Sequence, residues 1–179
     1  MGQVKRCLQA SRRAGYARAM PATAHERIRL RPGRRADIDA LLALEQAAFA
    51  TDHLSRRSFR HFLGSPTAAL IVAEHGNVVA GYALVLFRPR SLHGRLYSIA
   101  VASTSAGRGI GPMLLAAVEK AARRRGCKEL RLEVHEQNTA AISRYKKSGY
   151  RLFGRHPKYY DDGGDALRFE KPLGRSSTG

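Results

Sequence analysis

Three glycines at alternate positions stand between an apolar run and an amphipathic segment, in the order Gly107-Arg108-Gly109-Ile110-Gly111. The run at 95–101 predicts a strand, and apolar residues recur at helical spacing over 113–125, where Gly126 predicts the end of the helix. Glycines at this place free backbone N–H groups to converge on an anion at the positive end of the helix dipole. The segment therefore predicts a strand–loop–helix unit that can hold a diphosphate, although a simple turn uses the same residues.

Two familiar nucleotide-binding motifs are absent from this loop. The dinucleotide fingerprint G-x-G-x-x-G, counted from Gly109, needs a glycine where Leu114 stands. No Gly-Lys-Ser/Thr triplet of the Walker type is present. The phosphate-bearing ligand is therefore expected to belong to another class.

The remaining segments predict a mixed α/β domain. Apolar runs predict further strands at residues 28–31, 69–74, 78–87, 129–134, 150–153 and 166–173. Helices are expected to begin at three capping residues, Asp37, Ser55 and Thr139. The triplet His75-Gly76-Asn77, between two of the strands, has the chemistry of a hairpin turn.

Lysine and arginine outnumber aspartate and glutamate by 32 to 14, which gives a formal net charge of +18. A surface of this sign attracts phosphates, nucleic acid or acidic proteins without choosing among them. Residues 1–25 contain no acid and predict a disordered basic tail, followed by one domain at 26–174 and a disordered C-terminus at 175–179. An alternative is that Met20 is the natural start and the residues before it are a misread extension.

The cysteines and the apolar runs indicate a soluble protein of a reducing compartment. Cys7 and Cys127 have no cysteine or histidine partner at metal-ligand spacing, so neither a metal site nor a disulfide framework is expected. The apolar runs are shorter than the roughly 20 residues that cross a bilayer. We therefore expect a cytoplasmic protein with no metal and no membrane partner.

Several motifs in order resemble the GNAT acetyltransferases. Ile99-Ala100-Val101, the glycine loop and Leu114-Leu115 are similar to motif A of that family. Downstream, the chain resembles one branch of the family, the ribosomal-protein-alanine N-acetyltransferases (RimI-like). The matching positions are Leu132-Glu133-Val134, Asn138, 140–142, Tyr145, Gly149-Tyr150, Tyr159-Tyr160 and Asp165-Ala166. The resemblance covers about residues 27–173. It implies the GNAT fold, a mixed and mostly antiparallel twisted sheet with a central splayed strand pair and about four flanking helices, and acetyl-CoA as co-substrate.

Two positions depart from the family pattern. The family usually has glutamine or arginine where this chain has Ala106, and commonly proline where it has Ser103. Because backbone N–H groups hold the anion, the loss is expected to weaken cofactor binding rather than abolish it. We expect Arg108, inside the loop, to supply the missing charge.

The implied chemistry is direct transfer of an acetyl group to an amine, which needs a base, oxyanion donors and an acid. Glu133 matches the strand glutamate of the family and is the expected base, acting directly or through a water. An ordinary glutamate has a pKa of about 4.3, so the site would have to raise it by partial burial. The alternative is a surface glutamate paired with Arg131 or another cation.

Tyr145 is the expected acid, since a phenol with a pKa of about 10 can protonate a departing thiolate. The alternative is that Tyr145 fills the core. His135 shares the face of Glu133, but such a histidine is more often an exposed strand residue, so it stays outside the expected catalytic set.

The resemblance also implies the binding residues. The cofactor is expected at Ile99, Ala100, Val101, Gly107, Arg108, Gly109, Ile110, Gly111 and Asn138, with an oxyanion donor among the backbone N–H groups of 99–101 and the pantetheine arm at Asn138. Tyr159 and Tyr160 are expected to hold the acceptor, and the acidic residues after them to attract a cationic amine. A polar hairpin turn with aromatic packing is the alternative.

Three functions remain open. The first is acetylation of the N-terminal α-amine of a protein or peptide such as a ribosomal protein, because an α-amine titrates about 2.5 pH units below lysine and needs only a modest base. The second is acetylation of a small-molecule amine. The third is a weakly catalytic acetyl-CoA-binding or RNA-associated module, with nucleic acid bound through the basic tail.

Overall fold

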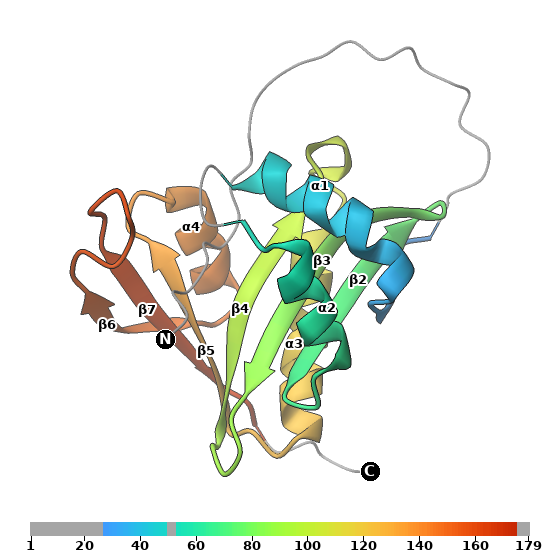
Figure 1. The fold of residues 1–179 in the computed structure, drawn as a ribbon. Coiled ribbons are helices and arrows are strands. Elements are labelled where there is room, and N and C mark those ends of the chain that lie inside the picture. The colour runs from blue at the N-terminus through green and yellow to red at the C-terminus, as the bar shows by residue number, and fades with distance from the viewer. Residues whose placement is uncertain (1–26, 50–52, 175–179) are drawn as a thin grey trace.

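The computed structural model describes residues 27–49 and 53–174, so the predictions for 1–25 and 175–179 lie outside the described residues. The chain forms one seven-stranded sheet with four α-helices (Figure 1). The strands are β1 (Arg29–Pro32), β2 (Ala68–His75), β3 (Val78–Phe87), β4 (His93–Val101), β5 (Glu129–His135), β6 (Arg151–His156) and β7 (Ala166–Pro172). The helices are α1 (Ile38–Ala48), α2 (Arg56–Gly64), α3 (Ile110–Arg124) and α4 (Thr139–Lys147), with 3-10 turns η1 (Arg35–Asp37) and η2 (Ser103–Ser105).

The strand order is β1-β2-β3-β4-β5-β7-β6, and every neighbouring pair is antiparallel except β4 and β5. Helices α1 and α2 cover one face of the sheet and α3 the other (Figure 1). The sheet is mixed and mostly antiparallel, as the resemblance implies. No helix within the described ranges is long and apolar enough to cross a membrane.

The two parallel strands separate after their first three residue pairs. Pairing of β4 with β5 runs only from His93 opposite Glu129 to Arg95 opposite Arg131. Beyond that point β4 carries one extra residue, Tyr97, because Leu84 pairs with Ser98 while the next residue of β3 pairs with Leu96. Such a bulge bends a strand and increases its twist. The splayed pair, visible as the widening space between β4 and β5 in Figure 1, confirms the prediction for the centre of the sheet.

Two apolar cores lie on opposite faces of the sheet. One joins α3 to the sheet and includes Leu114, Val118, Leu130 and Leu132; the other lies under α1 and α2 and includes Leu41, Phe59 and Leu84. The alternation predicted for β5 is therefore correct, with its leucines in the α3-side core.

The helix starts differ in detail from the predictions. Ser55 caps α2 as predicted, since its Oγ accepts the N–H of Ser58 at 3.1 Å. For α4 the cap is Asn138 rather than Thr139, because Asn138 Oδ1 accepts the N–H of Ala141 at 3.1 Å. Asparagine is at least as favourable an N-cap residue as threonine, so the helix begins one residue earlier than predicted.

Two further predictions need correction. Helix α3 begins at Ile110, not Met113, so the last glycine of the loop belongs to its first turn. Asp37 precedes α1, but its carboxylate makes no cap bond to that helix. Instead it accepts a hydrogen bond from each of the two terminal nitrogens of Arg31, both at 2.8 Å. An arginine fork satisfies a carboxylate better than a single helix amide.

Candidate active site

The glycine loop forms an open cradle at the start of α3. Gly107 and Gly109 have φ values of 79° and 75°, a region that side chains with a Cβ rarely occupy. No side chain caps α3, and its first turn contains no acid. The first N–H groups of the helix therefore remain available to an anion at its positive end. A cavity of about 280 Å³ lies here, and Gly107, Gly109 and Ile110 line it.

Arg144 lines the cavity beside this cradle, and Arg108 does not. Arg108 is exposed and lies outside the lining of the 280 Å³ cavity. Arg144, on α4, lines that cavity and also a second one of about 140 Å³. Sequence reasoning missed Arg144, because only the packing of α4 against α3 brings it to the loop.

The second cavity is an apolar slot between β4, α3 and α4. Its lining joins three residues predicted for the site, namely Ile99, Gly111 and Tyr145. Tyr145 is 3% exposed, and its ring lies 5.7 Å from that of Tyr150. Asn138 stands at the start of α4, where its side-chain oxygen is engaged in the cap. The structure thus brings the loop, β4 and the predicted acid together on one side of the sheet.

Glu133 lies on the other side, in a larger groove. This groove of about 550 Å³ is bordered by α2, the ends of β3 and β4, and the β5–β7–β6 part of the sheet, and both Glu133 and Tyr159 line it. Nε of Arg95 donates to Oε2 of Glu133 at 3.1 Å, and Nε of Arg168 lies 3.9 Å from Oε1. Glu133 is therefore a buried carboxylate and not a surface one. It pairs with Arg95, which is another cation of the kind that the alternative named beside Arg131.

The two tyrosines of the β6–β7 segment have different surroundings. The hydroxyl of Tyr159 accepts a hydrogen bond from Nη2 of Arg95 at 3.3 Å, which places it in the groove. Tyr160 is 4% exposed, and its ring packs on that of His135 with centroids 4.8 Å apart. Of the two tyrosines, Tyr159 lines the groove and Tyr160 does not.

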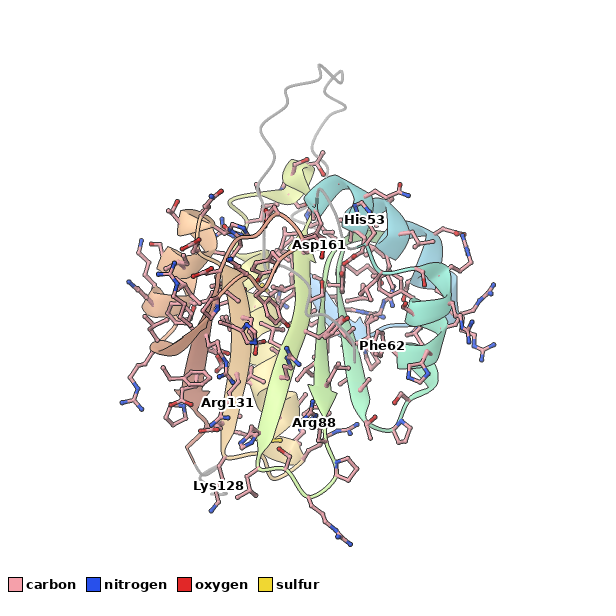
Figure 2. All side chains as sticks on the ribbon, turned by 60° about the vertical axis from the view of Figure 1, so that its left-hand side comes forward. His53, Phe62, Arg88, Lys128, Arg131 and Asp161 are labelled. Atoms are coloured by element: carbon pink, nitrogen blue, oxygen red, sulfur yellow. The ribbon has the colours of Figure 1, made fainter. Side chains whose placement is uncertain are left out.

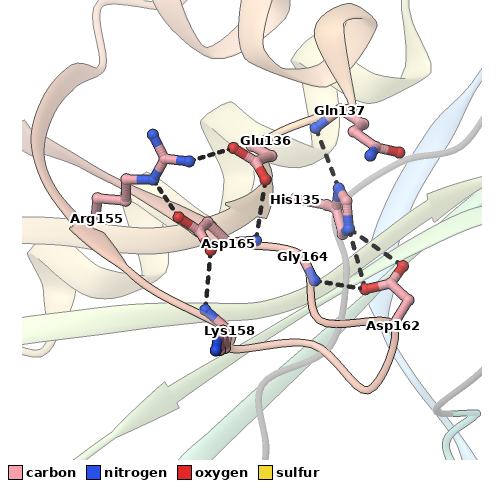
Figure 3. Close-up of polar contacts among 8 residues, drawn as sticks. All are labelled: His135, Glu136, Gln137, Arg155, Lys158, Asp162, Gly164 and Asp165. Carbon is pink, nitrogen blue, oxygen red and sulfur yellow. Dashed lines mark hydrogen bonds and ion pairs between the residues drawn. The ribbon is translucent and has the colours of Figure 1, made fainter.

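His135 fastens the β6–β7 segment to β5 (Figure 3). Its Nδ1 accepts the N–H of Gln137 at 3.1 Å, so the proton of the ring is on Nε2, which faces the Asp162 carboxylate at 3.2 Å. Gly164 passes so close that a Cβ there would lie 2.1 Å from Nε2. With both ring nitrogens engaged, His135 positions the hairpin.

Two of the three acidic residues of this segment, Asp162 and Asp165, are used within it, whereas Asp161 is exposed. Asp165 accepts the N–H of Lys158 at 2.9 Å and pairs with Arg155, and these contacts, the backbone bond first, hold the pKa of its carboxyl below the usual value (Figure 3). Asp162 is occupied by His135 and by the N–H of Gly164. The expected attraction of a cationic amine to these acids is thereby weakened.

No group of three or more histidine, cysteine, aspartate or glutamate residues within 27–49 and 53–174 is placed to hold a metal ion.

Residues 36–150, which include the glycine loop, Glu133 and Tyr145, match the acetyltransferase (GNAT) family. The chain belongs to the GNAT family. As a GNAT N-acetyltransferase it is an enzyme, and it uses acetyl-CoA as the acetyl donor.

Curated relatives of this GNAT enzyme include acetyltransferases of two kinds. An N-alpha-acetyltransferase of Sulfurisphaera tokodaii is 31% identical over 156 residues, which cover 81% of this chain and 93% of that protein. N-alpha-acetyltransferase RimI of Mycobacterium tuberculosis is 31% identical over 147 residues, covering 80% and 91%. A thialysine N-epsilon-acetyltransferase of Mus musculus is 27% identical over 139 residues, covering 76% and 79%.

Solved structures share the GNAT fold over most of the chain. The ribosomal-protein-S18-alanine N-acetyltransferase of Escherichia coli has a TM-score of 0.74 at 24% identity, covering 85% of this chain and 97% of that one. A Salmonella typhimurium acetyltransferase, solved with its cofactor acetyl-CoA, has a TM-score of 0.71 at 20% identity, covering 86% and 98%.

The GNAT cofactor fits the residues on the α3 side of the sheet. The uncapped start of α3 suits a diphosphate, Arg144 adds a positive charge, and the apolar slot that reaches Tyr145 suits an uncharged arm. The groove that contains Glu133 lies on the opposite face of the sheet.

Proposed function

We propose that this enzyme acetylates the N-terminal α-amine of a protein or peptide, a ribosomal protein among them. The observation that carries the proposal is the open groove of about 550 Å³ that Glu133 and Tyr159 line, which has room for an extended segment of polypeptide. Two relatives at 31% identity, named as N-alpha-acetyltransferases, support the same acceptor.

The proposed chemistry assigns one proton transfer to each side of the sheet. The Glu133 carboxylate accepts the proton of the acceptor ammonium, and the amine nitrogen forms a bond to the acetyl carbonyl carbon. The C–S bond to CoA then breaks, and the Tyr145 hydroxyl gives its proton to the departing thiolate. The nitrogen releases its second proton as the amide forms, and a proton from solvent restores the Tyr145 hydroxyl. A backbone N–H group among Ile99, Ala100 and Val101, on the splayed part of β4, is the proposed donor to the oxyanion.

The binding roles complete the proposal. Gly107, Gly109, Ile110 and Gly111 supply N–H groups for the cofactor phosphates, and Arg144 takes the role that the sequence suggested for Arg108. Asn138 is proposed to contact the pantetheine arm, and Tyr159 is proposed to contact the acceptor. Tyr160, being buried, is proposed to act only by supporting the hairpin.

Acetylation of a side-chain or small-molecule amine is the second candidate, because the murine relative is named as an N-epsilon enzyme. Such an amine near the lysine value carries a deprotonation cost of about 3.4 kcal/mol more than an α-amine. An acid-rich acceptor site would offset this cost, and Glu133 is the one acid among the described residues that line the groove. The α-amine therefore ranks first.

The test measures CoA release with three acceptors, namely a peptide with a free N-terminus and no lysine, an N-terminally blocked peptide with one lysine, and a set of small amines. We expect release with the free N-terminus, and a loss of kcat of about 100-fold or more in Glu133→Gln with unchanged acetyl-CoA binding. Asp39→Asn, an exposed carboxylate on α1, is the control and should leave kcat unchanged. Release with the blocked lysine peptide or small amines alone would refute the proposed acceptor.

A cytoplasmic location belongs to the same proposal, and the free, buried thiol of Cys127 suits a reducing compartment. RNA association through residues 1–25 is the remaining alternative. Deleting those residues should leave acetyl transfer unchanged, while RNA retention that falls steeply with salt and disappears with the deletion would support the alternative.

A further inference from the structure

Arginine dominates the groove in front of Glu133. Four arginines from β4, β5, β7 and the segment after β3 line it, namely Arg88, Arg95, Arg131 and Arg168. Figure 2 shows Arg88 and Arg131 on the face of the sheet that Phe62 of α2 borders. An acceptor that enters this groove approaches Glu133 between guanidinium groups.

Two of these arginines share one carboxylate. Arg95 donates from Nε to Glu133 at 3.1 Å, and Nε of Arg168 lies 3.9 Å from the other oxygen of Glu133. One carboxylate balances the charge of one guanidinium group. This triplet therefore keeps one positive charge beside the proposed base.

The other two arginines do not remove that excess. Arg131 pairs with two carboxylates outside the groove lining, Glu129 and Glu170, at 2.6 Å and 3.4 Å, and this group carries one negative charge, which the positive charge of Arg88 offsets. Arg88 is exposed and makes no ion pair with any residue of the described ranges. The groove as a whole thus favours a ligand with negative charge.

The arginines of the triplet are more open to a ligand than the glutamate. The side chains of Arg95 and Arg168 are 32% and 38% exposed, whereas that of Glu133 is 11% exposed. A carboxylate that enters the groove meets the guanidinium groups first. An ammonium without a carboxylate near it meets an excess of like charge.

We infer that the acceptor is a peptide N-terminus with aspartate or glutamate at its first or second position, and that Arg95 and Arg168 bind this side chain. The inference rests on the proposed N-terminal acetylation and names the acceptor class of the same site. Once the acceptor carboxylate pairs with the two arginines, Glu133 no longer has to balance them and is free to accept the ammonium proton. The arginines bind the acceptor and position the base.

The test uses the full chain, acetyl-CoA and amidated peptides of equal length and without lysine, which differ only in aspartate or asparagine at position one or at position two. Aspartate and asparagine have the same shape, so the comparison isolates the charge. At whichever position gives the larger effect, we expect kcat/KM to be about tenfold or more higher for the aspartate peptide than for the matching asparagine peptide. This factor corresponds to one hydrogen bond to a charged group. Because the same pairing frees Glu133, we expect the preference in kcat as well as in KM, and mass spectrometry should place the acetyl group on the α-amine.

Arg95→Gln and Arg168→Gln should each reduce the ratio of kcat/KM for the aspartate peptide to kcat/KM for the asparagine peptide. The loss of kcat/KM should therefore be larger for the aspartate peptide than for the asparagine peptide. Arg151→Gln removes an exposed arginine of β6 that lies outside the groove lining, and should leave the preference intact. Circular dichroism and acetyl-CoA binding of each variant would exclude a folding defect as the cause.

Equal kcat/KM for aspartate and asparagine at both positions would overturn the inference while leaving N-terminal acetylation in place. A preference that survives in both arginine variants would overturn the assignment to Arg95 and Arg168. Failure to acetylate any free N-terminus would refute the proposed function, and this inference with it.

Discussion

Nε of Arg95 lies 3.1 Å from the carboxylate of Glu133, and the same arginine donates from Nη2 to the hydroxyl of Tyr159 at 3.3 Å. One residue of β4 thus connects the proposed base on β5 with the proposed acceptor contact on the β6–β7 segment. Arg95 stands in the last pair before β4 and β5 separate, opposite Arg131. Arg95, Glu133 and Tyr159 therefore meet where β4 and β5 separate.

Tyr145→Phe should lower kcat by about 100-fold or more and leave acetyl-CoA affinity nearly unchanged. The change removes only the hydroxyl, which is the proposed proton donor to the thiolate, and keeps the ring that packs beside Tyr150. Single-turnover kinetics and equilibrium binding separate the two effects. Tyr150→Phe is the matched control, because its hydroxyl donates to Glu119 at 3.1 Å, and it should affect stability but not kcat. An unchanged kcat in Tyr145→Phe would favour the reading of Tyr145 as a core residue.

Arg144→Gln should weaken acetyl-CoA binding by about tenfold, the value of a charge-assisted hydrogen bond to phosphate. Arg108→Gln should have a smaller effect, because Arg108 is exposed and outside both cavities. Calorimetry with CoA, dephospho-CoA and phosphopantetheine would show which phosphate the arginine binds. Unchanged affinity in Arg144→Gln together with a loss in Arg108→Gln would restore the role that the sequence suggested for Arg108.

The fold could be predicted from the sequence because its signals are local. The β5 alternation, the Gly76-Asn77 turn with φ values of 56° and 61°, and the glycine loop each depend on neighbouring residues. Glu133 and Tyr145 were found by their resemblance to family motifs and not by periodicity.

The partners of the site residues could not be predicted, because they depend on strand register and helix packing. Arg95 and Glu133 are 38 residues apart, and only the parallel register of β4 with β5 brings them together. The burial of Glu45 on α1 is a different case, because a sequence signal for it existed and was not used. Glu45 lies four residues from Leu41 and four from Phe49, hence on the apolar face of α1, so a signal of burial was present in the sequence.

Glu45→Gln should destabilise the fold by about 2–4 kcal/mol, because it turns an amide donor toward groups that already donate. Glu45 is fully buried and accepts the N–H of Leu54 at 2.6 Å, the Ser98 hydroxyl at 3.1 Å and the Tyr82 hydroxyl. Since Leu54 leads into α2, which borders the groove, KM for the acceptor peptide should rise as well. Urea unfolding and peptide kinetics measure the two effects. Gln46→Ala, on the exposed side of α1, should change neither, and a loss below about 0.5 kcal/mol in Glu45→Gln would contradict the role given to this network.

The ion pair of Asp37 with Arg31 should make stability depend on pH in a defined direction. The Arg31 guanidinium donates to both oxygens of Asp37 and holds the pKa of this carboxyl below its ordinary value of 3.8. The folded state therefore binds fewer protons than the unfolded state near that pH, so the contribution is present above pH 3.8 and is lost as the pH falls toward the folded pKa. Asp37→Asn should cost about 1–2 kcal/mol at neutral pH, because Glu74 still pairs with Arg31.

Urea unfolding of the unmodified protein and Asp37→Asn across a series of pH values tests this dependence. The difference between the two proteins should stay constant from neutral pH down to about pH 5 and shrink below the ordinary aspartate value. Asp39→Asn is the matched control, since Asp39 pairs with Arg56 on the exposed side of α1, where an ion pair contributes little. A difference for Asp37→Asn that is the same at every pH would mean that the side chain stabilises β1 and η1 through shape and hydrogen bonds and not through its charge.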